Sequence, residues 1–182
     1  MPRTLNCAVC LIMILFASVT QAHAQDSQRF EAFGSLGTSW YDSSSGQSFN
    51  FGGGVGWRPF GQSTRLLDGM GFELELNHSF KRELVFSRTI GTADFLYRFN
   101  VRRTEPYVLV GFGFSRTPAI CTHVCGTPEE HWVQTAGAGV NIFLREHWAL
   151  RPEIRAFKGQ LADYLGNHDY LGRASIALSY HW

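Results

Sequence analysis

Charged residues recur at every second position within apolar segments, and this alternation has the clearest potential for chemistry. Between residues 70 and 80, Glu73 and Glu75 alternate with Phe72, Leu74 and Leu76. Alternate positions share one face of a β-strand, so such a face can hold paired charges or line a water-filled pore. The same parity along the chain predicts one inward-facing network of six acids and five bases: Glu31, Arg58, Glu73, Glu75, Asp94, Arg98, Glu105, Arg151, Glu153, Arg155 and Arg173.

The near balance of the two signs favours a structural plug over a pore. A barrel of eight strands has room for side chains and little else. An unpaired buried charge is costly, so we expect the acids and bases to pair with one another. A selective pore would carry a ring of one sign. A narrow or gated channel for small solutes is the alternative.

Two cysteines four positions apart, Cys121 and Cys125, form the second group with chemical potential. In an oxidising compartment such a pair can close a small ring, and we expect a disulfide. The rival interpretation is metal capture by the two thiolates with His123 and His131, which are zinc-type ligands. The spacing is not a known zinc pattern, and oxidation would remove the site, so we expect no bound metal.

The neighbouring His78 and Ser79 raise the question of nucleophilic catalysis. Strand alternation places them on opposite faces, so their side chains point apart. No carboxylate is evidently placed to orient the histidine, as a catalytic triad requires. We expect no catalysis and no cofactor, and we interpret His168 and Asp169 as solvated turn residues.

The elements that position these residues are strands, because the apolar pattern repeats with period two. In residues 170–182, one face carries Tyr170, Ile176, Tyr180 and Trp182, and the other is more polar. Lengths near ten residues suit tilted membrane strands. The segments predict an all-β fold, an eight-stranded antiparallel up-and-down transmembrane barrel, with strands at residues 30–41, 49–60, 70–80, 86–99, 106–115, 132–144, 148–157 and 170–182.

The charged face must line the lumen and the apolar face must meet lipid, because alternate carboxylates are not tolerated against lipid. A soluble barrel of the lipocalin type would instead bury its aromatic residues in the lumen, and a narrow barrel cannot easily hold them. Aromatic residues near the strand ends predict two girdles about one membrane thickness apart. The predicted girdle residues are Trp40, Trp57, Phe99, Trp132, Trp148, Tyr170, Tyr180 and Trp182.

Three features depart from this regular pattern. Ile90 and Leu96 fall on the polar face of residues 86–99, and Pro152 predicts a local bulge because proline cannot donate to a central ladder. The predicted connections alternate between long and short, which places the termini and the short turns at one end. The long connections at the other end are residues 42–48, 81–85, 116–131 and 158–169.

The N-terminal segment predicts export. A short basic start is followed by the apolar residues 7–19 and by Ala22 and Ala24 at signal-peptidase spacing. We expect residues 1–24 to be a signal peptide and residues 25–182 to form one barrel domain. The rest of the chain has no apolar run of 18 residues, so no transmembrane helix is expected. With 16 basic and 15 acidic residues overall, the charge indicates no nucleic-acid partner.

Several motifs resemble the outer-membrane β-barrel domain family, of the OmpA, OmpX and opacity-protein type. The resemblance covers residues 28–182, and the best motifs are segments 29–31 (RFE), 51–57 (FGGGVGW), 107–113 (YVLVGFG), 137–140 (GAGV) and 150–155 (LRPEIR). It implies a cell outer-membrane location, contact with outer-membrane lipid and lipopolysaccharide, and help from the outer-membrane assembly machinery.

For function the resemblance implies a structural or surface-interaction role, with a possible extracellular ligand bound through the long connections. A porin-like channel is the alternative. The third candidate is a lipid A-modifying enzyme, because small outer-membrane barrels include enzymes that use His and Ser. No peptidoglycan-binding domain follows Trp182 in this sequence, so an anchoring role of that kind is not expected.

Overall fold

The fold is taken from a computed structural model of the chain. It describes residues 29–41, 47–60, 67, 69–81, 86–99, 104–117, 129–163 and 166–182. The predicted signal peptide and the predicted Cys121–Cys125 disulfide lie outside the described residues. So does most of three predicted long connections, at residues 42–46, 82–85 and 118–128.

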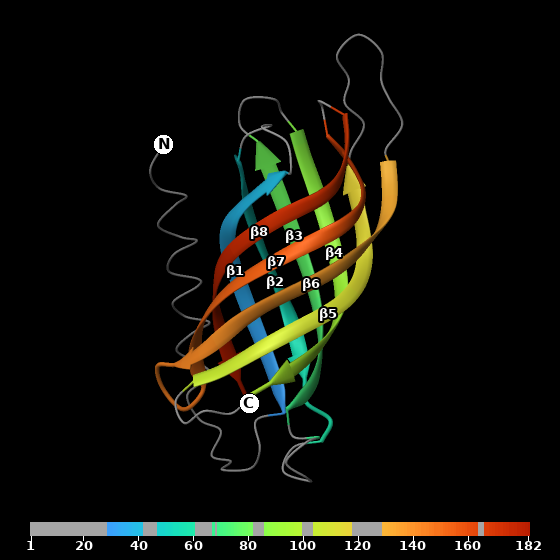
Figure 1. The fold of residues 1–182 in the computed structure, drawn as a ribbon. Helices are drawn as coiled ribbons and strands as arrows, with labels where there is room; N and C mark the ends of the chain where they lie inside the picture. The colour runs from blue at the N-terminus through green and yellow to red at the C-terminus, as the bar shows by residue number, and fades with distance from the viewer. Residues whose placement is uncertain are drawn as a thin grey trace, which may run out of the picture.

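Eight antiparallel strands close into one barrel, with each strand paired to the next and β8 paired to β1 (Figure 1). The predicted fold is confirmed. All eight predicted segments are strands, and the largest differences in extent are in the second half of the chain, where the strands are longer than predicted. The strands are β1 Phe30–Tyr41, β2 Gln47–Trp57, β3 Met70–Lys81, β4 Phe86–Arg98, β5 Thr104–Thr117, β6 Glu129–Phe143, β7 Trp148–Asp163 and β8 Gly166–His181.

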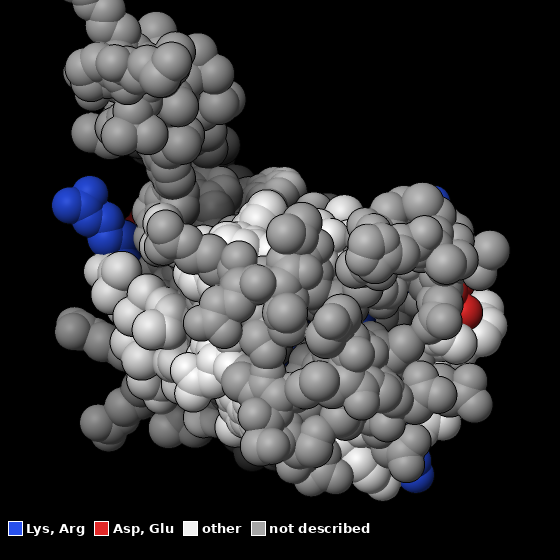
Figure 2. All heavy atoms as spheres, turned by 90° about the horizontal axis from the view of Figure 1, so that it is seen from above, with Lys and Arg blue, Asp and Glu red and all other residues white. Residues whose placement is uncertain are grey.

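Side chains alternate between a buried polar face and an exposed apolar face, as the period of two requires. In β3, Glu73 and Glu75 are buried, whereas Phe72, Leu74 and Leu76 are 48–60% exposed. In the view from above in Figure 2, the described atoms that can be seen are mostly uncharged. No helix in the described part of the chain is long and apolar enough to span a membrane.

Ile90 and Leu96 follow the strand parity and lie inside the barrel, where they belong to two apolar layers. One layer packs Ile90 with Val133, Phe157 and Leu171. The other packs Leu96 with Tyr107 and Leu109. The lumen is therefore not polar throughout, which explains why these two residues break the polar pattern of their strand.

Pro152 does not produce the predicted bulge. It pairs in register with Ile176 of β8, and the register shift between β7 and β8 lies between Lys158 and Leu161. On its other side, β7 pairs with β6. This pairing is interrupted between the pair Gly139 and Glu153 and the pair Ile142 and Leu150, and the register is the same on both sides of the interruption. The missing N–H of proline thus interrupts the ladder but inserts no residue.

The predicted connection at residues 158–169 is mostly strand. Backbone pairing between β7 and β8 continues to Asp163 and Gly166, so the hairpin is longer than its polar sequence indicated. In Figure 1 the ends of β6, β7 and β8 reach the top of the barrel, and the C-terminus lies at the bottom. We call the end with Phe30 and Trp182 the terminal end, and the other the opposite end.

The seam between β1 and β8 at the terminal end depends on Trp182. Its backbone exchanges two hydrogen bonds of 3.0 Å with Phe30, and its ring stacks on Phe30 at 6.2 Å and on Tyr180 at 6.0 Å between centroids. Aromatic pairs each contribute about 0.5–1.5 kcal/mol. Trp182 therefore joins the last strand to the first.

Changing Trp182 to Asp is expected to lower the free energy of unfolding by about 1–3 kcal/mol, because both stacked pairs are lost. The same change at Trp132, which is 77% exposed at the opposite end, is expected to cost about 1 kcal/mol or less. Denaturant titrations of both refolded variants, followed by the heat-dependent gel shift of the closed barrel, measure the difference. Equal losses would contradict a special role for Trp182 in closing the seam.

Candidate functional site

The interior of the barrel is the candidate site, because it gathers the charged residues that the alternation singled out. Of the eleven predicted network residues, ten are buried and Arg58 is half-buried. Ten of them lie on β1, β3, β4, β5, β7 and β8, and Arg58 lies just after β2. Because the strands are tilted and the sheet closes on itself, residues that are far apart in the sequence come together in one layer.

Arg155 on β7 is the centre of this layer. Its Nη1 lies 2.6 Å from Asp94 Oδ2 and 3.0 Å from Glu75 Oε2, and its Nη2 donates to Glu73 Oε1 at 2.6 Å. Its Nε donates to Glu153 on the same strand. One guanidinium therefore contacts four carboxylates across the lumen.

Arg151, two positions before Glu153, is held by ion pairs with carboxylates and by contacts with aromatic rings. It donates two hydrogen bonds to Glu73, at 2.6 and 3.1 Å, and one to Glu153 at 2.8 Å. Its guanidinium carbon lies 4.5 Å from the Phe33 ring centroid and 4.7 Å from that of Tyr107. Cation–π contacts of this kind strengthen when they are desolvated, so the two rings fix the arginine in place.

Glu153 joins the arginines into one network. Besides Arg151 and Arg155, it accepts hydrogen bonds from Arg173 Nη2 at 3.1 Å and from the Tyr107 hydroxyl at 2.6 Å. Arg173 also lies 2.8 Å from Glu75. Charge-assisted hydrogen bonds of this length are the strong class, and here they connect strands on all sides of the lumen.

Sequence reasoning missed Arg88, which is only 1% exposed. It lies on β4 with the same parity as Asp94 and Arg98, and that parity was the signal that could have identified it. Its Nε donates to the Thr117 hydroxyl at 3.4 Å. Among the residues whose burial the structure describes, the buried or half-buried set with Arg88 contains six arginines and six carboxylates, so the two signs balance.

A second group of contacts lies nearer the terminal end. Arg58 donates two hydrogen bonds to Glu105, at 3.1 and 2.6 Å, and Arg98 pairs with Glu31. This group closes the network toward the terminal end with ion pairs of its own.

Ser179, His181 and Glu31 stand in the order of a nucleophile, a base and an acid. Ser179 Oγ lies 3.0 Å from His181 Nε2, and His181 Nδ1 lies 3.5 Å from Glu31 Oε2. Ser179 is 0% exposed, however, and its hydroxyl also contacts the Ala149 carbonyl oxygen at 3.3 Å. A nucleophile must be reached by its substrate, so this geometry supports a structural hydrogen bond between Ser179 and His181, with the Glu31 carboxylate near the imidazole.

The other pair considered for catalysis is divided between the two faces. Ser79 is buried in the lumen, whereas His78 lies on the outer face with its Nδ1 3.0 Å from Thr89 Oγ1. The two side chains therefore point apart, as strand parity requires.

Glu73, Glu75 and Asp94 are the described carboxylates that could hold a metal ion, with ligand atoms within 4.8 Å of one another. The guanidinium of Arg155 contacts all three, at 2.6 to 3.0 Å. The positive charge that this group of acids needs is thus supplied by the protein itself. The residues present do not fit a metal ion.

The predicted girdle residues all lie on the outer face, near the two ends. Trp57, Phe99, Trp148, Tyr180 and Trp182 lie toward the terminal end, and their rings form contacts such as Trp148–Tyr180 at 4.9 Å. The other three predicted girdle residues, Trp40, Trp132 and Tyr170, lie toward the opposite end and are 37%, 77% and 47% exposed.

A closed antiparallel barrel with a charged interior and an apolar, aromatic-banded exterior is a transmembrane β-barrel of the outer-membrane class. The family model described as outer membrane protein beta-barrel domain matches residues 8–181. The chain belongs to this family and is an outer-membrane protein. A search of curated protein sequences found no match.

Solved structures with the same fold have diverse roles. The crystal structure of Neisserial surface protein A shares 12% identity over 84% of this chain and 96% of its own, with a TM-score of 0.67. The attachment invasion locus protein Ail of Yersinia pestis shares 11% identity over 85% of this chain and 97% of its own, with a TM-score of 0.54. The outer membrane enzyme PagL shares 11% identity over 82% of this chain and 98% of its own, with a TM-score of 0.52.

Proposed function

We propose that this outer-membrane protein is a structural or surface-interacting barrel that neither conducts solutes nor catalyses a reaction. The single observation that carries the proposal is the described part of the lumen, where six arginines and six carboxylates balance and four acids surround Arg155. Conduction requires hydrated charges that ions can pass, whereas each of these six carboxylates pairs with an arginine.

The apolar layers support the same conclusion. Two apolar layers share the lumen with the charge network, one around Ile90 and Val133 and the other around Leu96 and Leu109. A pore selective for one kind of ion would carry charges of one sign at its constriction. Here the described interior combines paired charges with packed apolar side chains, which is the composition of a plug.

A surface-interaction role is favoured by the long strands at the opposite end. The backbone ladder of β7 and β8 continues from Lys158–Tyr170, at the level of the predicted girdle, to Asp163–Gly166. Strands that continue past the girdle extend beyond the lipid and can present the connections between them. We propose that the opposite end faces outside the cell and contacts an extracellular ligand there.

Planar-bilayer recordings test this function. Folded protein, verified by its heat-dependent gel shift, is expected to give no stable conductance steps, while a general porin in the same bilayers serves as the positive control. Reproducible steps from the folded protein, absent from boiled samples, would overturn the proposal and make the small-solute channel the better function.

A further inference from the structure

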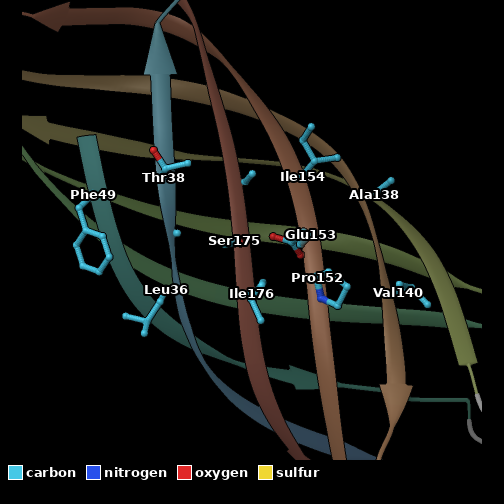
Figure 3. Close-up of a pocket in the computed structure, with 12 residues that line it drawn as sticks. Leu36, Thr38, Phe49, Ala138, Val140, Pro152, Glu153, Ile154, Ser175 and Ile176 are labelled. Carbon is cyan, nitrogen blue, oxygen red and sulfur yellow. The ribbon is translucent and has the colours of Figure 1, made fainter. Parts of the chain in front are cut away.

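The lipid-facing surface contains a groove that the lumen network does not explain. It crosses the outer faces of β2, β1, β8, β7 and β6, with Leu36 and Phe49 on one side and Val140 on the other (Figure 3). Its volume is about 860 Å³, within the roughly 300–1,000 Å³ range of small-molecule sites.

Small residues and Pro152 produce this hollow. Ala138 and Ala174 line it where the outward positions of β2–β5 carry residues such as Phe72 and Phe112. Pro152 lines it at the place where the ladder between β6 and β7 lapses. The hydroxyl of Thr38, which also lines the groove, donates to the Ser48 carbonyl at 3.2 Å. The groove can therefore take an apolar chain without leaving this hydroxyl unpaired.

A cation lies in line with the groove, toward the opposite end. Ile154 of the groove and Lys158 are four residues apart on β7, about 13 Å at roughly 3.3 Å per residue, and both face outward. Lys158 is exposed, and its Nζ lies 5.7 Å from the ring centroid of the girdle residue Tyr170. Gln134, which pairs in register with Lys158, adds an exposed polar side chain at the same level.

Lys158 differs from the other outward-facing charges described within the strands. Arg116 and Glu130 lie 3.5 Å from each other and so compensate each other's charge. Lys158 instead places a positive charge above an apolar groove at the membrane boundary, which is the charge pattern that complements an anionic lipid.

We propose that this groove binds one acyl chain of a phosphate-bearing lipid, and that Lys158 and Gln134 contact the lipid phosphate. The lipid is in the leaflet on the Lys158 side, which under the proposed orientation is the outer leaflet with its phosphorylated glycolipid. The inference rests on that orientation and is independent of whether the lumen conducts.

The test is a titration of delipidated, folded protein in mild detergent with lipid A, read by native mass spectrometry. One lipid per barrel is expected to be retained by the wild type. Lys158→Gln is expected to weaken binding about fivefold, and Ala174→Phe, which fills the groove, about tenfold or more. The matched controls Arg116→Gln and Ala93→Phe, on outward positions away from the groove, are expected to stay within about twofold.

Lipid A without its phosphates is expected to bind equally to the wild type and to Lys158→Gln, because the phosphate contact is then absent. Ala138→Phe serves in place of Ala174→Phe if that variant gives no gel shift. Equal binding by all variants would show non-specific annular lipid and overturn the proposal. The proposal would also be overturned if the wild type formed lipid-free dimers and Ala174→Phe dissociated them. The groove would then bind a second copy of this chain.

Discussion

Replacing Glu153 by alanine is expected to lower the free energy of unfolding by about 3–5 kcal/mol, the usual cost of removing one partner from a buried ion pair. The change leaves Arg151, Arg155 and Arg173 without their shared carboxylate and the Tyr107 hydroxyl without its acceptor. Denaturant titrations in lipid vesicles or detergent, followed by tryptophan fluorescence and the heat-dependent gel shift, measure the loss.

The matched control is Glu130→Ala. Glu130 is a carboxylate with a side chain that is 66% exposed and lies 3.5 Å from Arg116. Exposed ion pairs contribute about 1 kcal/mol or less, so this variant is expected to stay within about half a kcal/mol of the wild type. Equal midpoints for the two variants would indicate a hydrated lumen with unpaired charges, and would favour the channel.

A double variant separates charge imbalance from loss of packing. Glu153→Gln keeps the shape of the side chain but leaves the lumen with one excess positive charge. Adding Arg173→Met restores the balance, because Arg173 contacts Glu153 and Glu75. We expect the double variant to be less destabilised than the sum of the single changes, as coupled neighbours are. A strictly additive result would mean that the two residues do not interact.

Changing Leu76 to Arg is expected to lower the free energy of unfolding in lipid bilayers by about 2–4 kcal/mol, the cost of a charge on the lipid face near mid-membrane. Leu76 lies at the middle of β3 and is 56% exposed. In a water-soluble barrel the same change at so exposed a site would have little effect. Unfolding titrations in vesicles of defined thickness measure the difference.

The control is Leu144→Arg. Leu144 is 61% exposed but lies in the turn between β6 and β7, beyond the strand ends. The cost near the interface falls to about 0–1 kcal/mol, so Leu144→Arg is expected to be mild. Equal effects at the two leucines would contradict the placement of β3 across the bilayer. In thinner bilayers the destabilisation by Leu76→Arg is expected to fall more than that by Leu144→Arg, because the arginine at position 76 then reaches the interface more easily.

Side-chain parity could be predicted from the sequence because it is a local property of the strand backbone. Successive residues point to opposite faces whatever the rest of the chain does. This rule separates Glu73 from Leu76 on β3, and the exclusion of carboxylates from lipid then places Glu73 inward and Leu76 outward. The number of strands follows from the number of segments that alternate in this way. The same rule would have included Arg88, had it been applied to the whole of β4.

Only the tertiary structure decided which charges meet. Arg155 contacts Glu73 across 82 positions of sequence, a distance set by strand tilt and by the closure of β8 on β1. The apolar layer around Ile90 likewise needs residues from four strands. Whether Pro152 inserts a bulge or only interrupts a ladder also depends on its neighbours, and that interruption lies in the groove below Lys158. These features arise from contacts between distant strands, and a local period of two carries no information about them.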